Sequence, residues 1–186
     1  MSDDDWRADP LVWGQGPRRF EIFLEPTCPY SGRAFGKIDE LLAKAGEDRS
    51  SVELILLSQP WHLYSGVITR AILAASTMEG GRETAKKVMA AVFAHRDDFE
   101  FDDHCTGPNM DATPNDILAR IKETSGVDVA EAFAIPGLDR EIKHHTKYAR
   151  QNGAHVSPTF MIDGLADLSI GSGDTVESWM EKLKLG

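Results

Sequence analysis

The residue best placed for chemistry is Cys28, in the run Cys28-Pro29-Tyr30-Ser31. This run follows a predicted strand and opens a predicted helix. A cysteine at the start of a helix faces the positive end of the helix dipole and unpaired backbone N–H groups, and both favour the thiolate form. Pro29 suits the first helical position, where a backbone N–H would have no partner. The spacing therefore indicates a nucleophilic thiol, although a buried structural cysteine would fit the same pattern.

A second motif, Val156-Ser157-Pro158-Thr159-Phe160, lies far along the chain and leads into another predicted strand. A proline directly before an apolar strand marks its entrance, because proline has no N–H to contribute to the ladder. The Ser157–Pro158 bond could be cis, a state found in about one X–Pro bond in twenty in folded proteins. Taken alone, this motif is a weak signal.

Cys105 is the other thiol and the other candidate for a resolving cysteine. Its acidic neighbours oppose thiolate formation, so an ordinary loop thiol is the favoured interpretation. His104 and Cys105 are adjacent and do not make a tetrahedral metal site unaided. The acidic run 97–103 lacks the glycine and the terminal glutamate of an EF-hand loop. We therefore predict no metal site.

The histidines are weaker candidates. His62 follows a predicted strand and precedes a helix, so it could tune Cys28 or contact a substrate, and a histidine satisfied within its own loop is the plainer alternative. His155 precedes the second motif and could line the same cleft. His144 and His145 are neighbours on a predicted helix and point about 100° apart. Surface or packing roles suit that pair better than catalysis.

The elements that must position these residues begin with a β-α-β unit. Apolar and charged residues alternate over 19–25, which predicts a strand that Pro26 ends. A helix is predicted over 29–45, with Gly46 as its C-cap. The nearly continuous apolar run at 52–57 indicates a central strand covered on both faces. Such a unit implies a right-handed crossover and a parallel strand pair.

The middle of the chain is predicted to be helical, and the last part returns to strands. Apolar spacing predicts helices around 67–78 and 85–93, one that opens at Thr113-Pro114, and one over 138–151. Later elements are predicted as strands at 159–162 and 168–170, a turn at Asp163-Gly164, and a last helix over 176–183.

Composition excludes several classes of protein. The chain has 186 residues, of which 41% are hydrophobic, so it can bury a core and is not disordered. Its 20 basic and 30 acidic residues give a net charge of −10, which argues against a general nucleic-acid binder. Two cysteines cannot staple a disulfide-rich mini-protein.

Membrane and secretory signals are also missing from the sequence. No run approaches the roughly 18 apolar residues of a membrane helix, and the acidic start over 1–6 has no apolar signal region. We therefore expect a cytoplasmic protein with reduced thiols and no membrane partner.

Together, the motifs and their order resemble the DsbA-like branch of the thioredoxin superfamily. The matching parts are Cys28-Pro29-Tyr30-Ser31 after one strand, Gln59-Pro60-Trp61-His62 after the next, a helical insertion, and the segment 157–164. The resemblance spans most of the chain, from about Gly14 to Leu185. It implies that Pro158 is cis and faces the active cysteine.

The resemblance also implies a fold and a domain organisation. The expected class is α/β, a thioredoxin fold of order β-α-β … α-β-β-α with an inserted helical subdomain. We expect a single domain over 1–186, with its thioredoxin part at about 14–62 and 138–186. The helical insertion is then expected at about 63–137.

One departure from the family pattern matters. The family carries Cys-x-x-Cys, and the fourth position here is Ser31, so a dithiol cycle between these two positions is excluded. What remains is monothiol chemistry, in which Cys28 forms a mixed disulfide that an external thiol such as glutathione resolves. The Ser31 hydroxyl could hydrogen-bond the thiolate.

These considerations predict an enzyme, a monothiol thiol–disulfide oxidoreductase. We expect reductase, isomerase or deglutathionylation activity rather than dithiol oxidation. The expected partners are protein or glutathione disulfides and thiols, with no bound cofactor and glutathione as a co-substrate. The predicted catalytic residues are Cys28 and Ser31. The predicted substrate-binding residues are Pro29, Tyr30, His62, Ser157, Pro158 and Thr159.

Two alternatives stay open. Kappa-class glutathione transferases and the related chromene-carboxylate isomerases are similar in architecture, and they carry a Ser-Pro-Tyr-Ser type motif in which a serine at the position of Cys28 activates bound glutathione. The other alternative is a non-catalytic module that kept the fold, lost the redox pair and holds an extended peptide between Cys28 and Pro158.

Overall fold

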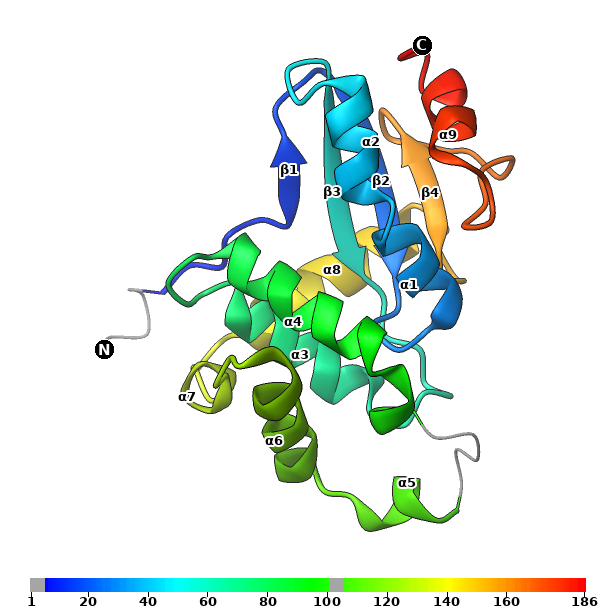
Figure 1. The fold of residues 1–186 in the computed structure, drawn as a ribbon. Coiled ribbons are helices and arrows are strands. Elements are labelled where there is room, and N and C mark those ends of the chain that lie inside the picture. The colour runs from blue at the N-terminus through cyan, green and yellow to red at the C-terminus, as the bar shows by residue number, and fades with distance from the viewer. Residues whose placement is uncertain (1–5, 101–105) are drawn as a thin grey trace.

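The computed structural model of the chain describes residues 6–100 and 106–186. Within these residues a five-stranded sheet runs through the upper part of the molecule in the order β1-β3-β2-β4-β5 (Figure 1). The strands are β1 (Val12–Gly14), β2 (Arg18–Leu24), β3 (Ser50–Leu56), β4 (Thr159–Ile162) and β5 (Leu165–Ala166). β2 and β3 are parallel, and the other neighbouring pairs are antiparallel. The predicted parallel β-α-β unit is therefore confirmed.

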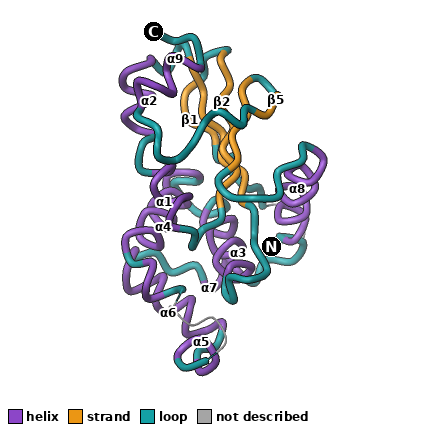
Figure 2. The backbone as a smooth tube through the Cα atoms, turned by 90° about the vertical axis from the view of Figure 1, so that its right-hand side faces the viewer, coloured by secondary structure: helices purple, strands orange, loops and turns teal. Residues whose placement is uncertain are grey.

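Helices cover both faces of the sheet, as Figure 2 shows from the side. The first face carries α1 (Pro29–Phe35), α2 (Ile38–Ala45) and α9 (Val176–Lys182), and α8 (Asp139–Gln151) crosses the second. Alternation along β2 explains this arrangement, because successive side chains of a strand point to opposite faces. Phe20 belongs to the core on the α9 side, where its ring packs against Trp179, whereas Phe23 belongs to a separate cluster with Ala149 of α8. The expected thioredoxin-type α/β class is thus observed.

A group of helices lies at one end of the sheet, between β3 and α8 in the chain (Figure 1). Its members are α3 (Ser65–Ala75), α4 (Arg82–Ala94), α5 (Pro108–Asp111), α6 (Pro114–Ser125), α7 (Ala130–Phe133) and a short 3-10 helix (Arg96–Asp98). Thr113 caps α6 as predicted, and the cap is a reciprocal one with Asp116. Among the described residues, no helix is both long and apolar enough to cross a membrane.

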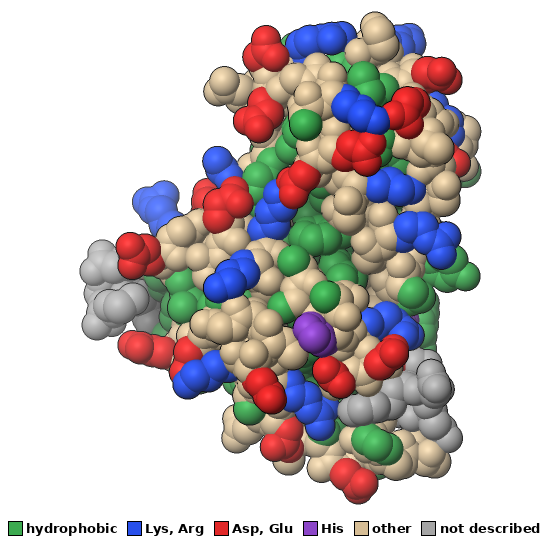
Figure 3. Space-filling view, in the orientation of Figure 1, with side chains coloured by type: hydrophobic (Ala, Val, Ile, Leu, Met, Phe, Trp, Pro, Cys, Tyr) green, Lys and Arg blue, Asp and Glu red, His purple; other side chains and the backbone are tan. Residues whose placement is uncertain are grey.

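Charged side chains on the surface are largely matched by opposite charges. Lys86 pairs with Asp39, and Lys44 pairs with both Glu40 and Glu177. On the face shown in Figure 3, basic and acidic side chains are interspersed over the helices and the sheet edge. Exposed pairs of this kind contribute little to stability. Their effect is to leave this face without a dominant sign of charge despite the net acidity of the chain.

The predicted single helix over 29–45 is wrong, because it is two helices. α1 ends at Phe35 and α2 begins at Ile38, with Gly36 and Lys37 between them. The Lys37 N–H bonds to the Ala34 carbonyl oxygen, three residues back, in a turn tighter than an α-helix, and the Lys37 ammonium group donates to the carbonyl oxygens of Ser172 and Asp174 in the segment before α9. The break therefore has a tertiary partner that apolar periodicity does not reveal.

The predicted strand at 168–170 is also wrong, since β5 occupies Leu165–Ala166 instead. The turn residues Asp163 and Gly164 both have positive φ angles, of 49° and 83°. Such angles belong to a two-residue hairpin turn, which requires the returning strand to begin at the next residue. Leu165 accordingly pairs with Ile162. The predicted turn at Asp163-Gly164 is confirmed, and it places the returning strand ahead of the predicted 168–170.

The edge strand β1 was not predicted at all. It has three residues, too few for an alternating pattern to be recognised, and it pairs antiparallel with β3. Trp13 at its centre is buried, and its indole N–H donates to a carboxylate oxygen of Glu83 at 2.7 Å. Long-range contacts therefore define this strand.

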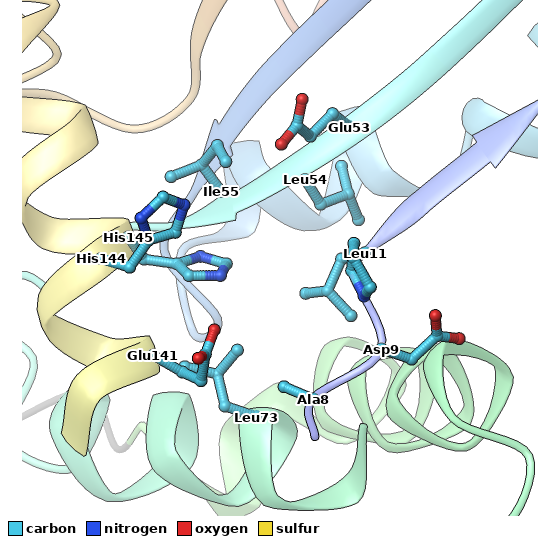
Figure 4. Close-up of a pocket in the computed structure, with 11 residues that line it drawn as sticks. Ala8, Asp9, Leu11, Glu53, Leu54, Ile55, Leu73, Glu141, His144 and His145 are labelled. Carbon is cyan, nitrogen blue, oxygen red and sulfur yellow. The ribbon is translucent and has the colours of Figure 1, made fainter. Parts of the chain in front are cut away.

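The α8 side of the sheet holds a buried histidine. His145 accepts a hydrogen bond at Nδ1 from the Leu56 backbone N–H, at 2.9 Å, whereas the neighbouring His144 is exposed. Figure 4 shows both rings beside a small pocket of about 100 Å³ that also touches β3, α3 and the segment before β1. Burial lowers the pKa of His145 from 6.5 to about 4, with a further contribution from the charge of His144.

We expect His145 to make the fold acid-sensitive. Between pH 6.5 and 4 the unfolded chain binds a proton at this imidazole and the folded chain does not. The free energy of unfolding should therefore have its full value above pH 6.5 and fall by about 3 kcal/mol as pH drops to 4. In His145→Asn, whose side-chain oxygen can still accept from Leu56, this part of the pH dependence should vanish.

Urea unfolding of the parent and the variant at pH 7, 5.5 and 4 measures the effect. His144→Asn is the matched control, because the same change is made one residue away on an exposed ring. Stability curves of His145→Asn and the parent that stay parallel from pH 7 to pH 4 would contradict this assignment.

Candidate active site

The two sequence motifs meet at the Cys28 thiol. Cys28 is the N-cap of α1, at the point where the chain leaves β2, and its side chain is 6% exposed. The thiol donates to the Ser157 carbonyl oxygen, with Sγ and the oxygen 3.7 Å apart, across 129 residues of sequence. The Ser157–Pro158 peptide bond next to this oxygen is cis. Pairing of β4 with β2 brings the two motifs together, because Thr159 lies opposite Phe23.

Ser31 lies one turn into α1 and is fully buried. Its hydroxyl oxygen accepts a hydrogen bond from the Glu25 backbone N–H at 3.1 Å. The expected bond between Ser31 and Cys28 is not seen between these two described residues. In the structure, Ser31 therefore ties the start of α1 back to the end of β2.

Beneath the Cys28 loop lies a buried carboxyl group, that of Glu25. It accepts hydrogen bonds from the Thr27 backbone N–H at 2.8 Å and from the Thr27 hydroxyl at 2.9 and 3.0 Å. The Ser65 hydroxyl of α3 bonds it as well, and Glu25 has no exposed surface. Burial raises the pKa of Glu25, and the hydrogen bonds oppose that rise. The loop before Cys28 is thus folded around this carboxyl group.

His62 turns its ring inward toward the same loop. Its Nδ1 lies 3.0 Å from the Thr27 hydroxyl oxygen, and its side chain is 11% exposed. Two carboxyl groups flank the same nitrogen: Glu25 Oε2 at 3.8 Å and Glu100 Oε1 at 3.5 Å. The structure therefore places His62 among buried acids behind the loop, rather than on its outer surface.

Two further side chains hold the loop in place. The Arg96 guanidinium donates through Nε to the Thr27 carbonyl oxygen at 2.8 Å. The Gln59 amide donates to the His155 carbonyl oxygen at 3.3 Å, which connects the chain after β3 to the segment before Pro158. Both bonds anchor one of the motifs to a part of the fold distant in sequence.

Several residues next in sequence to those of the site have exposed apolar or aromatic side chains. Tyr30 is 55% exposed and packs against the Arg33 guanidinium. Trp61, next to His62, is 57% exposed, and Val156, next to Ser157, is 65% exposed. Pro29 is exposed, and Pro158 and Thr159 are half-buried. Exposed apolar surface therefore lies next in sequence to the buried Cys28 and to the largely buried His62.

Sequence reasoning missed Glu25, Thr27, Gln59 and Arg96. Glu25 carried a usable signal, because an acid at the end of an apolar strand and directly before a proline is unusual in a buried position. Arg96 carried none, since its role depends on where the 3-10 helix after α4 meets the Cys28 loop. His155 contributes a backbone carbonyl oxygen to the site, and its side chain is exposed.

The other candidates do not join this site in the described part of the chain. His104 and Cys105 lie outside the described residues, so the structure does not place the second thiol. Over residues 6–100 and 106–186, no three His, Cys, Asp or Glu side chains are arranged so that they could hold a metal ion. The pocket of Figure 4 shares no residue with the Cys28 site.

Comparison with solved structures shows what the whole chain is similar to. A structure described as a "putative protein-disulfide isomerase from Pseudomonas syringae" is 62% identical, with a TM-score of 0.92, and the match covers 94% of this chain and 98% of that one. A thioredoxin-like oxidoreductase from Silicibacter pomeroyi matches at 19% identity, a TM-score of 0.64, and 95% and 91% coverage. The thiol-disulfide exchange protein alpha-DsbA2 from Wolbachia pipientis matches at 15% identity, a TM-score of 0.66, and 93% and 84% coverage.

The last two structures support the fold alone, because their identities are low. No protein-family model matches the chain, and no match was found among the curated proteins.

Proposed function

This chain belongs to the DsbA-like branch of the thioredoxin superfamily, and from that membership we propose that it is a thiol–disulfide oxidoreductase acting through Cys28 alone. The observation that carries the proposal is the position of the thiol. It lies at the start of a helix and within hydrogen-bond distance of the carbonyl oxygen that precedes a cis proline, and Ser31 occupies the place of a second cysteine.

The proposed reaction has two exchange steps. The Cys28 thiolate attacks one sulfur of a disulfide R–S–S–R′, which forms the mixed disulfide Cys28–S–S–R and releases R′ as a thiolate that takes up a proton. A second thiol then attacks the mixed disulfide and restores the Cys28 thiolate. When R is glutathionyl, the first step removes glutathione from a protein. The second step then yields oxidised glutathione if the attacking thiol is glutathione.

The presence of Ser31 is the reason for the direction of thiol–disulfide exchange that we propose. A serine cannot expel the bound partner by forming an internal disulfide, so the mixed disulfide persists until an external thiol arrives. Reduction, isomerisation and deglutathionylation need only the attacking thiol, whereas dithiol oxidation needs a stored disulfide. We therefore propose the first group of activities, with protein or glutathione disulfides as substrates.

The residues around the thiol suit this role. The exposed side chains of Pro29 and Tyr30 and the backbone at Ser157, Pro158 and Thr159 are proposed to contact the partner that carries the disulfide. Among these groups, the Ser157 carbonyl oxygen is the one that faces the sulfur directly. A disulfide partner would approach along this side, because Glu25 and His62 occupy the other.

Incubation with oxidised glutathione, followed by intact-mass measurement under non-reducing conditions, tests the proposal. The parent and a Cys105→Ser variant should each gain one glutathione, and treatment with dithiothreitol should remove it. The absence of any adduct on the parent, or an adduct that forms in Cys28→Ser and not in Cys105→Ser, would overturn the proposal.

A further inference from the structure

A chain of hydrogen-bonding groups leads from His62 to Glu25. The Thr27 hydroxyl lies between them, 3.0 Å from His62 Nδ1 and 2.9 Å from Glu25 Oε2. A hydroxyl has a single proton to donate and lone pairs to accept. It can therefore bond both neighbours at once only as a donor to one and an acceptor from the other.

Two arrangements of protons satisfy this chain. In the first, His62 carries a proton at Nδ1 and donates it to Thr27, which donates to an ionised Glu25. In the second, Glu25 is protonated and donates to Thr27, which donates to an unprotonated Nδ1. With the second ring nitrogen protonated in both cases, the two arrangements contain the same number of protons. They differ only in whether the ion pair of His62 and Glu25 exists.

Charged groups flank this chain of hydrogen-bonding groups from two parts of the fold. Glu25 comes from the end of β2, Glu100 follows the 3-10 helix with its Oε1 3.5 Å from His62 Nδ1, and Arg96 from that helix bonds the Thr27 carbonyl oxygen. When these two buried acids are ionised, they stabilise a positive charge on His62. A buried charge of this kind persists only where it is paired.

This chain of hydrogen-bonding groups ends beside Cys28. Thr27 immediately precedes Cys28, and the Cys28 backbone N–H donates to the Glu25 backbone carbonyl oxygen at 3.2 Å and also interacts with the Glu25 carboxyl group. A change of charge at His62 or Glu25 is consequently felt at the start of α1, where low exposure to water weakens screening.

We propose that His62 is a positioning residue for the thiol chemistry: through the Thr27 hydroxyl it shares one proton with Glu25, and loss of this shared proton as pH rises leaves a net negative charge next to Cys28. This inference rests on the proposed function. It assigns the inward-facing imidazole to proton handling behind the loop. The raised pKa of Glu25 agrees with it, because a carboxyl group that holds its proton more tightly is a better match for an imidazole.

The sign of the effect follows from the charges. When His62 is protonated, its positive charge favours the Cys28 thiolate. When it is neutral and Glu25 is ionised, the remaining negative charge opposes the thiolate. Removal of the imidazole should therefore slow the reaction of Cys28 at low pH and leave it nearly unchanged at high pH.

The test is the pH dependence of the second-order rate constant for Cys28 with an aromatic disulfide probe, 5,5′-dithiobis(2-nitrobenzoic acid), in a Cys105→Ser background. His62→Asn is the informative variant, because its amide can still donate to Thr27 but cannot titrate. We expect it to react about tenfold more slowly than the parent at pH 5.5 and within about twofold of it at pH 8.5. His144→Asn, at an exposed ring on α8, should follow the parent at every pH.

A constant ratio of the two rate constants from pH 5.5 to 8.5 would show a purely structural role for His62 and would overturn the inference. Thr27→Val provides a second route to the answer, since it removes the hydroxyl between the two groups and should change the pH profile in the same direction as His62→Asn. A parent protein whose Cys28 reacts with no disulfide would refute the proposed function instead. The two failures are therefore distinguishable.

Discussion

Cys28→Ser should abolish thiol–disulfide exchange, with a loss of at least about 10³-fold in the rate of reduction of a glutathionylated peptide. A serine hydroxyl cannot form a mixed disulfide, so no part of the two-step exchange remains. The measurement is release of glutathione from the peptide in the presence of reduced glutathione. Cys105→Ser is the matched control, with the same substitution at the other thiol, and should retain parent activity.

The same variant separates the competing functions. In an enzyme of the kappa-class transferase type, a serine at this position activates bound glutathione, so Cys28→Ser would keep or gain glutathione-conjugating activity. In a non-catalytic module, neither the parent nor the variant would catalyse exchange, although both would bind peptide. Full exchange activity in Cys28→Ser would refute the monothiol mechanism, whatever the fold.

Among the substitutions considered, Trp179→Ala should cause the largest loss of stability, about 3–5 kcal/mol in the free energy of unfolding. Trp179 lies on α9 with no exposed surface, and its ring packs against Phe20 of β2 and Phe160 of β4 at centroid distances of 5.4 and 5.5 Å. Its indole N–H donates to the Gly171 carbonyl oxygen at 3.1 Å, which fixes the segment before α9. Truncation leaves a cavity and unpairs that carbonyl group.

Equilibrium unfolding in urea at pH 7 measures this loss. Trp61→Ala is the matched control, because it removes the same side chain at a position that is 57% exposed, and it should change stability by less than about 0.5 kcal/mol. Equal effects of the two substitutions would contradict the packing of α9 against the sheet. Since Phe160 follows Pro158 by two residues, Trp179→Ala should also slow the reaction of Cys28 with disulfides.

The local elements of this fold could be predicted because their causes are local. Alternation at 19–25 and the apolar run at 52–57 both lie on observed strands, and the start of α1 at Pro29 follows from proline's preference for the first helical turn. The predicted elements that are wrong lie where residues distant in sequence contact the segment. The predicted helix is interrupted at Gly36 and Lys37, where the Lys37 ammonium group bonds carbonyl oxygens near α9, and apolar spacing contains no trace of those partners.

The sequence by itself determined where a nucleophilic thiol could lie, and that this thiol has no second cysteine three residues after it. Cys28 at a strand-to-helix junction, Ser31 at the place of a second cysteine, and a proline before a strand are all properties of short runs of residues. The order of those runs along the chain was enough to indicate the superfamily. None of this required knowledge of which residues meet in space.

Only the tertiary structure decided what surrounds the sulfur. The Ser157 carbonyl oxygen reaches Cys28 because β4 pairs with β2, and His62 reaches Thr27 because β3 pairs with β2 in parallel. The buried position of Glu25, and with it the proton chain to His62, depends on α3 covering the end of the strand. Burial and long-range contact are properties of the assembled core, and for that reason these groups could not be assigned from residue spacing alone.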